Sequence, residues 1–442
     1  MKGCSAVFNV TTSRLIALLT LAVLALGALS ACSPGHTGGN EIGFLRGGAL
    51  WAIDPDGSNL HQIESGQFIG FSWSPNHQQI ALRQANGKPP GDTTAFGLGD
   101  LKSELGVTAI DGGNIIQITP PNSGLLRSDA WWDSSGNRLL YREEPPDRES
   151  AGGLPQWKLS QSDQPAGIAR KDLAASVVLP AINSDGSLIA SMDSKGTMFV
   201  WKPGSAPGAI VSGALTVLPG SNEPARPLWQ PNTGALLYAA AGPGPTDTKF
   251  LLRQSNGSTR TLATIANLQQ YAWSPDGNLL LARTSSDYRI YSEQGALRFA
   301  WDDRASASLP FWSPDSHFIL LLEPDGFSLV DVAAHTVSHL LNADLNLPAS
   351  PTAGQAPWLR PATNSPWKVD SSAFVFIAAT GSTWNAPSGR PLPLGSGTGD
   401  GLYVSVLNQQ QKTPQFPTLL DWGIHQDAAW STLDPNCAFL LA

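Results

Sequence analysis

The feature that most constrains the fold of this 442-residue chain is a short phrase, YAWSPDGNLLLAR (Tyr271–Arg283), which recurs in looser form along most of its length. Each copy places a large apolar residue, here called the anchor, before a polar turn and a short apolar run. The eight anchors are Trp73, Trp132, Ile182, Trp229, Trp273, Trp312, Trp367 and Trp430. Their spacings of 59, 50, 47, 44, 39, 55 and 63 residues are typical of propeller blades or solenoid units.

Short β-strands follow each anchor. After Trp273 come the apolar run Leu279–Ala282, the alternating segment Asp287–Gln294 and the run Ala296–Trp301. With the strand that ends at the anchor, the unit has four strands, which is the size of one propeller blade. Helical periodicity is absent after the first 40 residues, and 44 glycines and 35 prolines fit a chain rich in turns. We predict an all-β fold, a β-propeller of about eight four-stranded blades.

The two ends of the repeat region are incomplete in complementary ways. Strands within Glu41–Ile63 have no anchor before them, whereas Trp430 is followed by only one short apolar segment, Cys437–Ala442. Pairing of N- and C-terminal strands would complete a composite blade and close the ring. We expect Cys437–Ala442 to supply that pairing and to bury Cys437 as a small apolar residue. Since Glu41–Leu45 competes for the same strand position, seven blades are the alternative.

The Ser-Pro-Asp-Gly part of the phrase is interpreted as a turn, not as a ligand site. Pro275 fixes φ, Asp276 can accept hydrogen bonds from neighbouring backbone, and Gly277 tolerates a positive φ. The segment nearest to a calcium loop, Asp54–Asn59, lacks the closing glutamate of such loops, so we predict no metal site. The anchor tryptophans are expected to pack between blades.

Residues 1–31 are predicted to be a signal peptide. Lys2 and Arg14 supply positive charge, and the apolar run Leu15–Leu29 falls short of the roughly 20 residues that span a bilayer. The run ends in Leu-Ser-Ala-Cys at Cys32, which resembles the lipobox of bacterial lipoproteins. That resemblance implies cleavage before Cys32 and lipid attachment to its sulfur; the alternative is an ordinary secretory signal. Residues 32–40 are then a lipidated cysteine and flexible tether, and residues 41–442 a single propeller domain.

Removal of the signal peptide leaves an acidic chain. Loss of Lys2 and Arg14 reduces the 27 basic residues to 25, against 35 acidic ones, which gives a formal charge of −10. No basic cluster is present, which argues against nucleic acid or anionic lipid as an electrostatic partner. With Cys4 removed and Cys32 acylated, Cys437 has no partner for an intramolecular disulfide.

The segment LWAIDPDGSNLHQI (Leu50–Ile63) and the W-S-P-D-G phrases resemble the TolB-type, WD-repeat-like propeller repeats of bacterial envelope proteins. The resemblance covers nearly all of the chain after Cys32 and implies the propeller fold. It implies no single function, since such blades serve peptidases, cyclases, lyases and non-catalytic scaffolds. TolB proteins also carry an α/β domain before the propeller. Only eight residues separate Cys32 from Glu41, so we expect that domain to be missing.

Catalytic motifs are not found in the sequence, which contains no G-x-S-x-G nucleophile elbow. His335 and His339 fall across a hairpin turn and a strand, where they share no helical face for zinc. The glycine-rich segment Gly395–Gly401 lacks the following helix of a phosphate cradle. The acidic clusters Glu143–Asp147 and Asp302–Asp303 are interpreted as solvated loop charge, not as acid–base pairs.

We therefore predict a membrane-anchored, extracytoplasmic scaffold that binds a protein, peptide or glycan, uses no cofactor and is not an enzyme. The longest insertions, at 143–156, 345–366 and 382–401, are candidate recognition loops. Trp384 and Arg390 in the last are candidate binding residues, because tryptophan and arginine are enriched at interface hot spots. The alternatives are a lyase- or cyclase-type enzyme with a dispersed active site in the central funnel, and a purely structural envelope component.

The lipobox predicts that a bacterial host labels the chain with palmitate at Cys32. Cys32→Ala is expected to abolish the label and to leave the precursor uncleaved or processed elsewhere. Cys4→Ala is the matched control and should label like the wild type, because Cys4 lies in the segment that is removed. Label retained by Cys32→Ala would contradict the lipobox prediction.

Overall fold

The blades predicted from the sequence are visible as successive antiparallel sheets. The computed structural model describes residues 40–431 except for 87–101, 128–129, 145–156, 164–169, 222, 303–308, 324–325, 343–364, 380, 386–391, 395–399, 409–412 and 424. They belong to one compact unit, Asn40–Ala442. The described residues form β-strands and the turns between them, and none of them belongs to a helix long and apolar enough to cross a membrane.

Three blades are simple four-stranded meanders in which the order in the sheet follows the sequence. Blade 1 contains β4 (Phe68–Trp73), β5 (Gln79–Ala85), β6 (Ser103–Ala109) and β7 (Ile116–Gln117). Blade 4 contains β16 (Leu228–Trp229), β17 (Leu236–Ala241), β18 (Asp247–Arg253) and β19 (Thr259–Ala266). Blade 5 contains β20 (Leu268–Trp273), β21 (Leu279–Thr284), β22 (Asp287–Ser292) and β23 (Leu297–Asp302).

Blades 2 and 3 share one long strand, β12 (Arg170–Ile182), whose first half pairs with β11 and whose second half pairs with β13. The other strands of blade 2 are β8 (Leu126–Arg127), β9 (Trp131–Trp132), β10 (Arg138–Glu144) and β11 (Trp157–Asp163). Those of blade 3 are β13 (Ile189–Met192), β14 (Met198–Trp201) and β15 (Gly208–Val211). The sequence did not signal this continuous strand.

The last insertion of the chain is built into blade 6. This blade contains β24 (Leu309–Trp312), β25 (Phe318–Glu323), β26 (Gly326–Asp331) and β27 (Thr336–Asn342), and β29 (Thr383–Trp384) and β30 (Leu392–Pro393) extend it. Blade 7 contains β28 (Ala373–Ala379), β31 (Asp400–Val406) and β32 (Thr418–Gly423). Its anchor, Trp367, forms an isolated bridge with Phe374 of β28 and so takes the innermost position.

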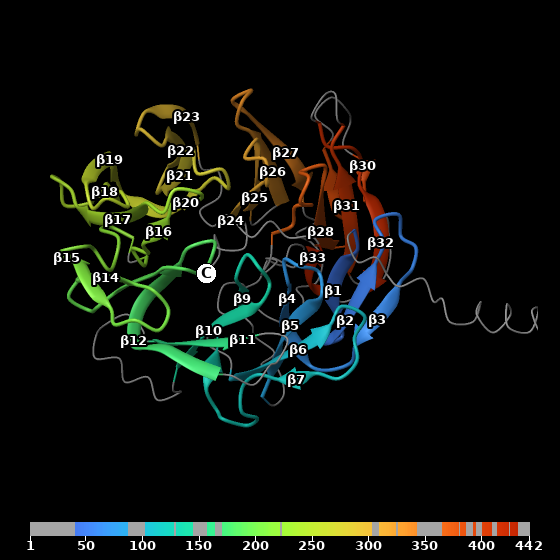
Figure 1. The fold of residues 1–442 in the computed structure, drawn as a ribbon. Coiled ribbons are helices and arrows are strands. Elements are labelled where there is room, and N and C mark those ends of the chain that lie inside the picture. Colours follow the sequence, from blue (N-terminus) through green and yellow to red (C-terminus); the bar gives the residue numbers. More distant parts are fainter. Residues whose placement is uncertain are drawn as a thin grey trace, which may run out of the picture. The chain divides into compact units, whose positions relative to one another are not determined.

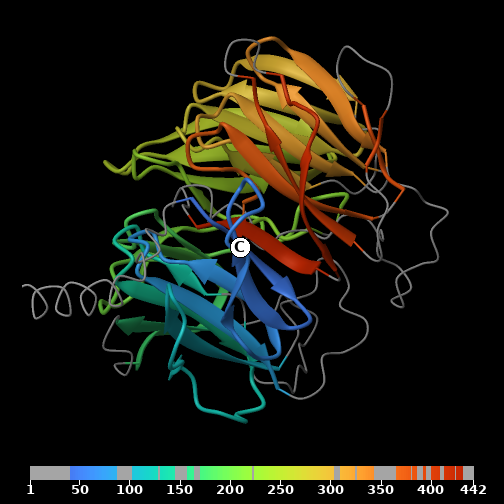
Figure 2. The ribbon, with the colours of Figure 1, turned by 90° about the vertical axis from the view of Figure 1, so that its right-hand side faces the viewer.

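Blade 8 closes the ring. It combines the C-terminal strand β33 (His425–Trp430) with the N-terminal strands β1 (Ile42–Arg46), β2 (Ala49–Ile53) and β3 (His61–Glu64), and Figure 2 shows β33 beside the N-terminal strands. Ile42 faces Trp430 in the pairing. The segment that begins at Glu41 therefore fills the position next to the last anchor, so eight blades are confirmed. Residues 437–442, expected to supply this pairing, lie outside the described residues.

Every interface between neighbouring blades is filled by its own hydrophobic cluster. The buried residues group into eight clusters, each of which takes side chains from two successive blades, including blades 8 and 1. In Figure 1, strands such as β4, β16, β20 and β33 lie toward the middle, and β3, β7, β19 and β23 lie at the periphery. The core is thus a ring of equivalent interfaces with no single centre.

The anchors occupy these interfaces, as the sequence predicted. Seven are tryptophans, and six of those are buried, with Trp229 half-buried. Four indoles donate a hydrogen bond to the carbonyl of the residue immediately before the preceding anchor, and the pairs are Trp132–Ser72 (3.2 Å), Trp229–Ala181 (3.1 Å), Trp367–Phe311 (3.0 Å) and Trp430–Pro366 (3.0 Å). Each such anchor therefore packs in the interface and also fixes its strand to the preceding blade.

The indole hydrogen bond at the closing interface should be measurable by comparing Trp430→Phe with Trp73→Phe. Both side chains are fully buried, but the indole nitrogen of Trp73 has no hydrogen-bond partner among the described residues. Both substitutions remove similar volume, so Trp430→Phe should lower the free energy of unfolding by about 1 kcal/mol more. Urea unfolding of the two variants checks this, and equal losses would show that the indole hydrogen bond contributes nothing.

Candidate functional site

The Ser-Pro-Asp-Gly turns use their polar groups internally, as predicted. Ser274 donates to the Asp276 carboxylate (2.5 Å), and the Asn278 backbone N–H donates to the same group (3.1 Å). Burial alone would raise the pKa of Asp276, but these hydrogen bonds outweigh it and hold the pKa below its usual value. In six of the eight copies the residue four positions after the anchor has a positive φ; these residues are His77, Gly136, Gly186, Gly277, Ser316 and Ser371.

Neighbouring turns are also hydrogen-bonded to one another, so few of their polar groups remain for a ligand. A Cβ at Gly277 would lie 2.7 Å from the carbonyl oxygen of Pro231 in the preceding blade, so a side chain is excluded there. The hydrogen bonds between successive turns are His77–Ser431 (2.8 Å), Asn76–Gly136 (3.3 Å), Gln230–Gly277 (2.7 Å), Asp276–Ser316 (3.1 Å) and Asp315–Ser371 (3.0 Å).

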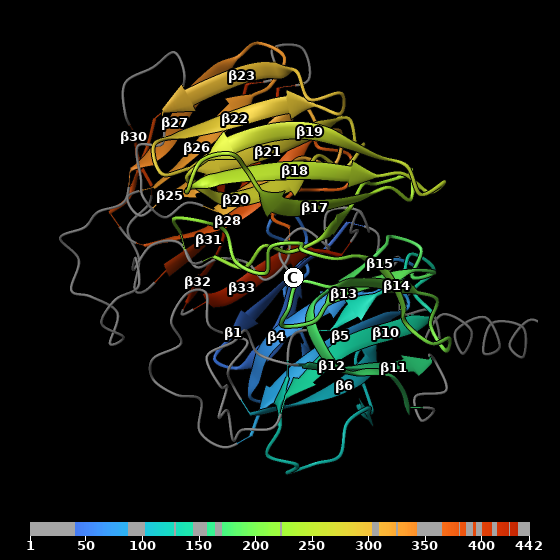
Figure 3. The same cartoon turned by 90° about the vertical axis from the view of Figure 1, so that its left-hand side faces the viewer.

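A cavity of about 370 Å³ lies where blades 3 and 4 meet, on the side of these turns. Figure 3 faces these two blades. The cavity is lined by the end of β12 with its turn, by the approach to β16 with its turn, and by Trp131 of blade 2 and Trp273 of blade 5. It therefore lies along the innermost strands of four consecutive blades. It also adjoins Ile182, the one anchor that is not tryptophan.

The walls of the cavity are mostly apolar. Trp131 and Trp229 are half-buried, so part of each indole remains accessible. The other apolar lining residues are Pro180, Ala181, Ile182, Leu188, Pro227, Leu228, Pro231 and Trp273. A concave, largely apolar site with a few polar groups is the usual form of a small-ligand site.

Arg226 is the one cation among the lining residues. Burial lowers the pKa of its guanidinium, and Tyr271 and Glu223 partly oppose that effect. Its Nη1 atom is buried and has no hydrogen-bond partner among the described residues, and none of their carboxylates forms an ion pair with it. The Tyr271 hydroxyl contacts the Arg226 backbone carbonyl, so the backbone is held while part of the guanidinium is left unsatisfied.

The remaining polar groups of the cavity are largely engaged by their own turns. The Asp185 carboxylate accepts from the Ser187 backbone N–H (2.8 Å), and the Asn183 side chain accepts from the Leu188 N–H (2.8 Å). The Gln230 amide donates to the Gly277 carbonyl (2.7 Å). Arg226 is therefore the strongest recognition group in the cavity. The sequence prediction missed it, although its place three residues before an anchor marks it as part of an inner-strand segment.

A serine, a histidine and a glutamate meet in blade 6, but not in the order of a catalytic triad. His339 Nδ1 lies 3.1 Å from Ser328 Oγ and 3.0 Å from Glu323 Oε2, and its Nε2 faces Asn342 Oδ1 at 2.8 Å. In a triad, one ring nitrogen contacts the hydroxyl and the other contacts the acid. Here Ser328 also donates to Glu323, so the hydroxyl is not positioned against a free base.

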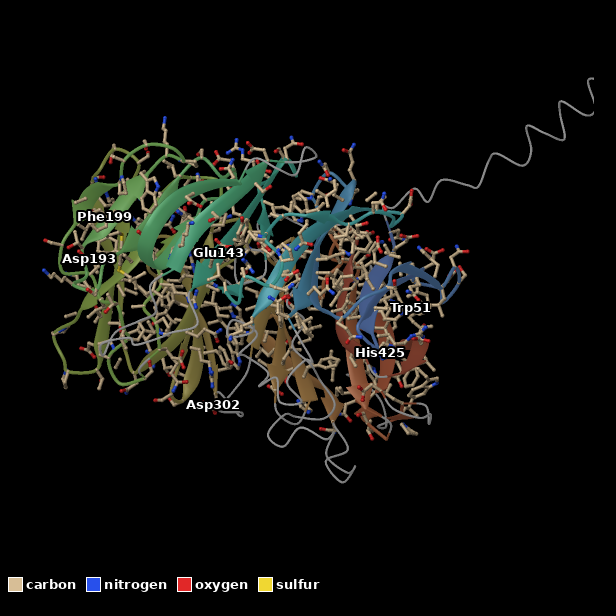
Figure 4. All side chains as sticks on the ribbon, turned by 90° about the horizontal axis from the view of Figure 1, so that it is seen from below. Trp51, Glu143, Asp193, Phe199, Asp302 and His425 are labelled. Atoms are coloured by element: carbon tan, nitrogen blue, oxygen red, sulfur yellow. The ribbon has the colours of Figure 1, made fainter. Side chains whose placement is uncertain are left out.

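A second polar cluster connects blade 7 with the closing blade. The Asp421 carboxylate of β32 forms an ion pair with Arg46 of β1 and accepts from His425 Nε2 (3.1 Å), and the Arg46 guanidinium lies 4.0 Å from the Trp51 ring centre. Figure 4 labels Trp51 and His425 on their strands. Burial alone would raise the pKa of Asp421, but the hydrogen bond with His425 and the charge of Arg46 hold it below its usual value.

Trp384 requires a correction. It was predicted to be a binding residue in a recognition loop, but it lies in β29, pairs with Leu341 of β27 and is fully buried. Its ring packs against Phe327 (5.7 Å) and Phe376 (5.9 Å) in the interface between blades 6 and 7. The second candidate, Arg390, and the lipidation residue, Cys32, lie outside the described residues.

Glu143 also requires a correction, because it is not solvated loop charge. It lies in β10, its side chain is 2% exposed, and it forms an ion pair with the buried Arg127 at 2.9 Å. Mutual neutralisation makes this burial tolerable. Asp302, at the end of β23, is exposed as predicted, whereas Asp147, Asp303 and residues 395–399 lie outside the described part of the chain.

The two histidines considered for zinc are placed as predicted, and they face different neighbours. His335 lies in a turn with a φ of 57° and stacks on Phe299 (4.9 Å), while His339 lies in β27 within the blade 6 cluster. Within the part of the chain that the structure describes, no group of three His, Cys, Asp or Glu residues could hold a metal ion.

Comparison with known proteins gives structural similarity and no family. No protein family matches the sequence, and no curated protein matches it. Similar solved structures include the C-terminal WD40 domain of Sif2 (14% identity, 84% of this chain, 91% of that chain, TM-score 0.46) and an oligogalacturonate lyase in complex with manganese (13%, 82%, 83%, 0.44). TolB from Acinetobacter baumannii is also similar (13%, 80%, 83%, 0.34). These structures are similar to the chain at low sequence identity, and the propeller fold itself rests on the chain's own sheets and their closure.

Asp421→Asn should destabilise the protein in a pH-dependent way. The ionised carboxylate is favoured in the folded state, so its contribution is complete above the unfolded pKa of about 3.9 and is lost as the pH falls through the lower folded pKa. We expect a loss of about 1–3 kcal/mol at pH 7 that shrinks toward pH 3, measured by urea unfolding. Asp370→Asn, which removes an exposed ion pair with Lys368, should cost less than about 1 kcal/mol. A loss for Asp421→Asn that is the same at both pH values would contradict this assignment.

Proposed function

We propose that this protein is a membrane-anchored, extracytoplasmic binding module that holds a protein, peptide or glycan partner in the cavity between blades 3 and 4 and does not transform it. The observation that carries the proposal is the cavity itself. It combines accessible indole surface from Trp131 and Trp229 with the guanidinium of Arg226, which has no acidic partner among the described residues. The anchoring part rests on the resemblance of the Cys32 segment to a lipobox.

Rigidity favours recognition at this place. The cavity walls belong to inner strands and to turns that are hydrogen-bonded to their neighbours, so little conformational entropy is lost when a ligand binds. Sites built on such elements hold their geometry better than sites on loops. The cavity therefore has the rigid walls that favour recognition.

The alternative function, a lyase- or cyclase-type propeller enzyme, has weaker support. The blade 6 cluster has the residue types of a nucleophilic site, but both Ser328 and Glu323 contact the same ring nitrogen of His339. In the cavity, the Asp185 carboxylate is held by its own turn and its pKa lies below the usual range, because hydrogen bonds from Ser187 and Asn183 outweigh the opposing effect of burial. A carboxylate with a lowered pKa is a poor general base at neutral pH.

The proposal predicts that the full-length, lipidated protein captures a partner from intact membranes in a saturable manner. Trp131→Ala should reduce capture at least about tenfold, because aromatic anchors carry much of the binding energy in such sites. Phe416→Ala is the control; Phe416 is a large exposed aromatic (49%) that is not among the cavity residues, and its loss should leave capture unchanged.

The captured partner should then be purified and titrated against both variants. Equal binding by Trp131→Ala and wild type would place recognition elsewhere and overturn the proposal. Turnover of the partner or its fragments, abolished by Asp185→Asn, would instead establish the enzyme alternative.

A further inference from the structure

We propose that the cavity between blades 3 and 4 recognises a single carboxylate attached to an apolar body, with Arg226 binding the carboxylate. This inference rests on the proposed function and specifies the ligand chemistry of that same site. A peptide C-terminus is the source that agrees with the proposed function. A free organic acid shares this chemistry, and the experiment distinguishes the two.

The Arg226 guanidinium has no ion pair with any described residue. Desolvating a charged group costs free energy unless a partner compensates it, so buried charges in proteins are normally paired. The buried ion pair of Arg127 with Glu143 in this same protein shows the usual solution. Arg226 is half-buried as a residue, and its Nη1 atom is fully buried. It has no equivalent pairing: Glu223 is close enough to influence its pKa but forms no ion pair with it among the described residues. An anionic ligand would supply the missing charge.

The number of charges favours a carboxylate over a phosphate. Arg226 is the single cation that lines the cavity, and Asp185, the single carboxylate, lies on the same lining. A phosphate, with about two negative charges at neutral pH, would be neutralised only in part and would also face Asp185. A carboxylate matches one guanidinium in charge and can accept two parallel hydrogen bonds from it.

The walls define the rest of the ligand. Trp131 and Trp229 are half-buried and contribute indole surface, although the Arg142 guanidinium already lies 5.1 Å from the Trp131 ring centre. Pro180, Pro227 and Pro231 add rigid apolar surface. The hydrogen-bonding groups of Asn183 and Gln230 are already used within the turns. Sugars carry hydroxyl groups that need donors and acceptors, so these walls suit an aromatic or branched apolar body better. The volume of about 370 Å³ is at the lower end for small-ligand sites, which fits a body of one or two rings or residues.

The test compares an acid with its neutral amide by isothermal titration calorimetry, with the intact protein at pH 7. The probes are N-acetyl-phenylalanine, N-acetyl-phenylalaninamide, phenylacetate and glucuronate. The wild type should bind the acid at least about tenfold more tightly than the amide, since only the acid pairs with Arg226. Arg226→Met should remove this difference, and Arg226→Lys should restore part of it. Trp131→Ala should weaken acid and amide alike.

Thermal melting of each variant separates a binding defect from a folding defect, and Arg226→Lys keeps the comparison available if Arg226→Met unfolds. Tighter binding of phenylacetate than of N-acetyl-phenylalanine would indicate a free organic acid as the source, and the reverse would indicate a peptide C-terminus. Equal binding of acid and amide, no binding of any probe, or tighter binding of glucuronate would overturn the inference. The capture experiment separates the two proposals. If Arg226→Met captures the membrane partner to the same extent as wild type and Trp131→Ala does not, the proposed function stands and only the carboxylate assignment fails.

Discussion

The interface between neighbouring blades is the constraint on which the rest of the structure depends. A single four-stranded blade cannot bury both of its faces, so each blade must pack against two others. The eight clusters meet this requirement with side chains from two blades each. Some anchor tryptophans also form a hydrogen bond across the interface. The Trp430 indole, for example, donates to the Pro366 carbonyl of the preceding blade. Since every blade depends on both neighbours, the ring is stable only when it is closed.

Closure explains the arrangement of the chain ends. The anchor strand β33 is C-terminal and the next three strands of its blade are N-terminal, so the two ends of the repeat region are held together in one sheet. The cluster of Arg46, Asp421 and His425 then connects this composite blade to blade 7 through groups that are mostly removed from solvent. Interaction across this junction joins residues about 375 positions apart in sequence. The closing interface thus uses charge in addition to the apolar packing found elsewhere.

The sequence predicted the elements that depend on local spacing and missed those that depend on long-range pairing. Anchors and turns recur at regular distances, so the blade number, the positive φ of Gly277 and the closure of the ring could be predicted from them. Trp384 was misplaced because its burial comes from pairing with Leu341, which lies across an insertion and leaves no periodic signal. Glu143 was misplaced for the same reason, since its partner Arg127 is visible only once β8 and β10 pair. The cavity was missed because no single segment contains it.

The cavity is a consequence of the same repeat that builds the ring. Residues immediately before each anchor belong to the innermost segment of a blade, so a departure from the repeat there changes the inner wall. Blade 3 is the one blade whose anchor, Ile182, is smaller than tryptophan and has no indole to donate, and Ile182 lines the cavity. Arg226 lies in the corresponding segment of blade 4, where one guanidinium atom, Nη1, has no hydrogen-bond partner among the described residues. An irregular anchor and a cation without an ion pair in the described part of the chain meet at this one interface. A ligand that fills the space and pairs with the charge would therefore stabilise it.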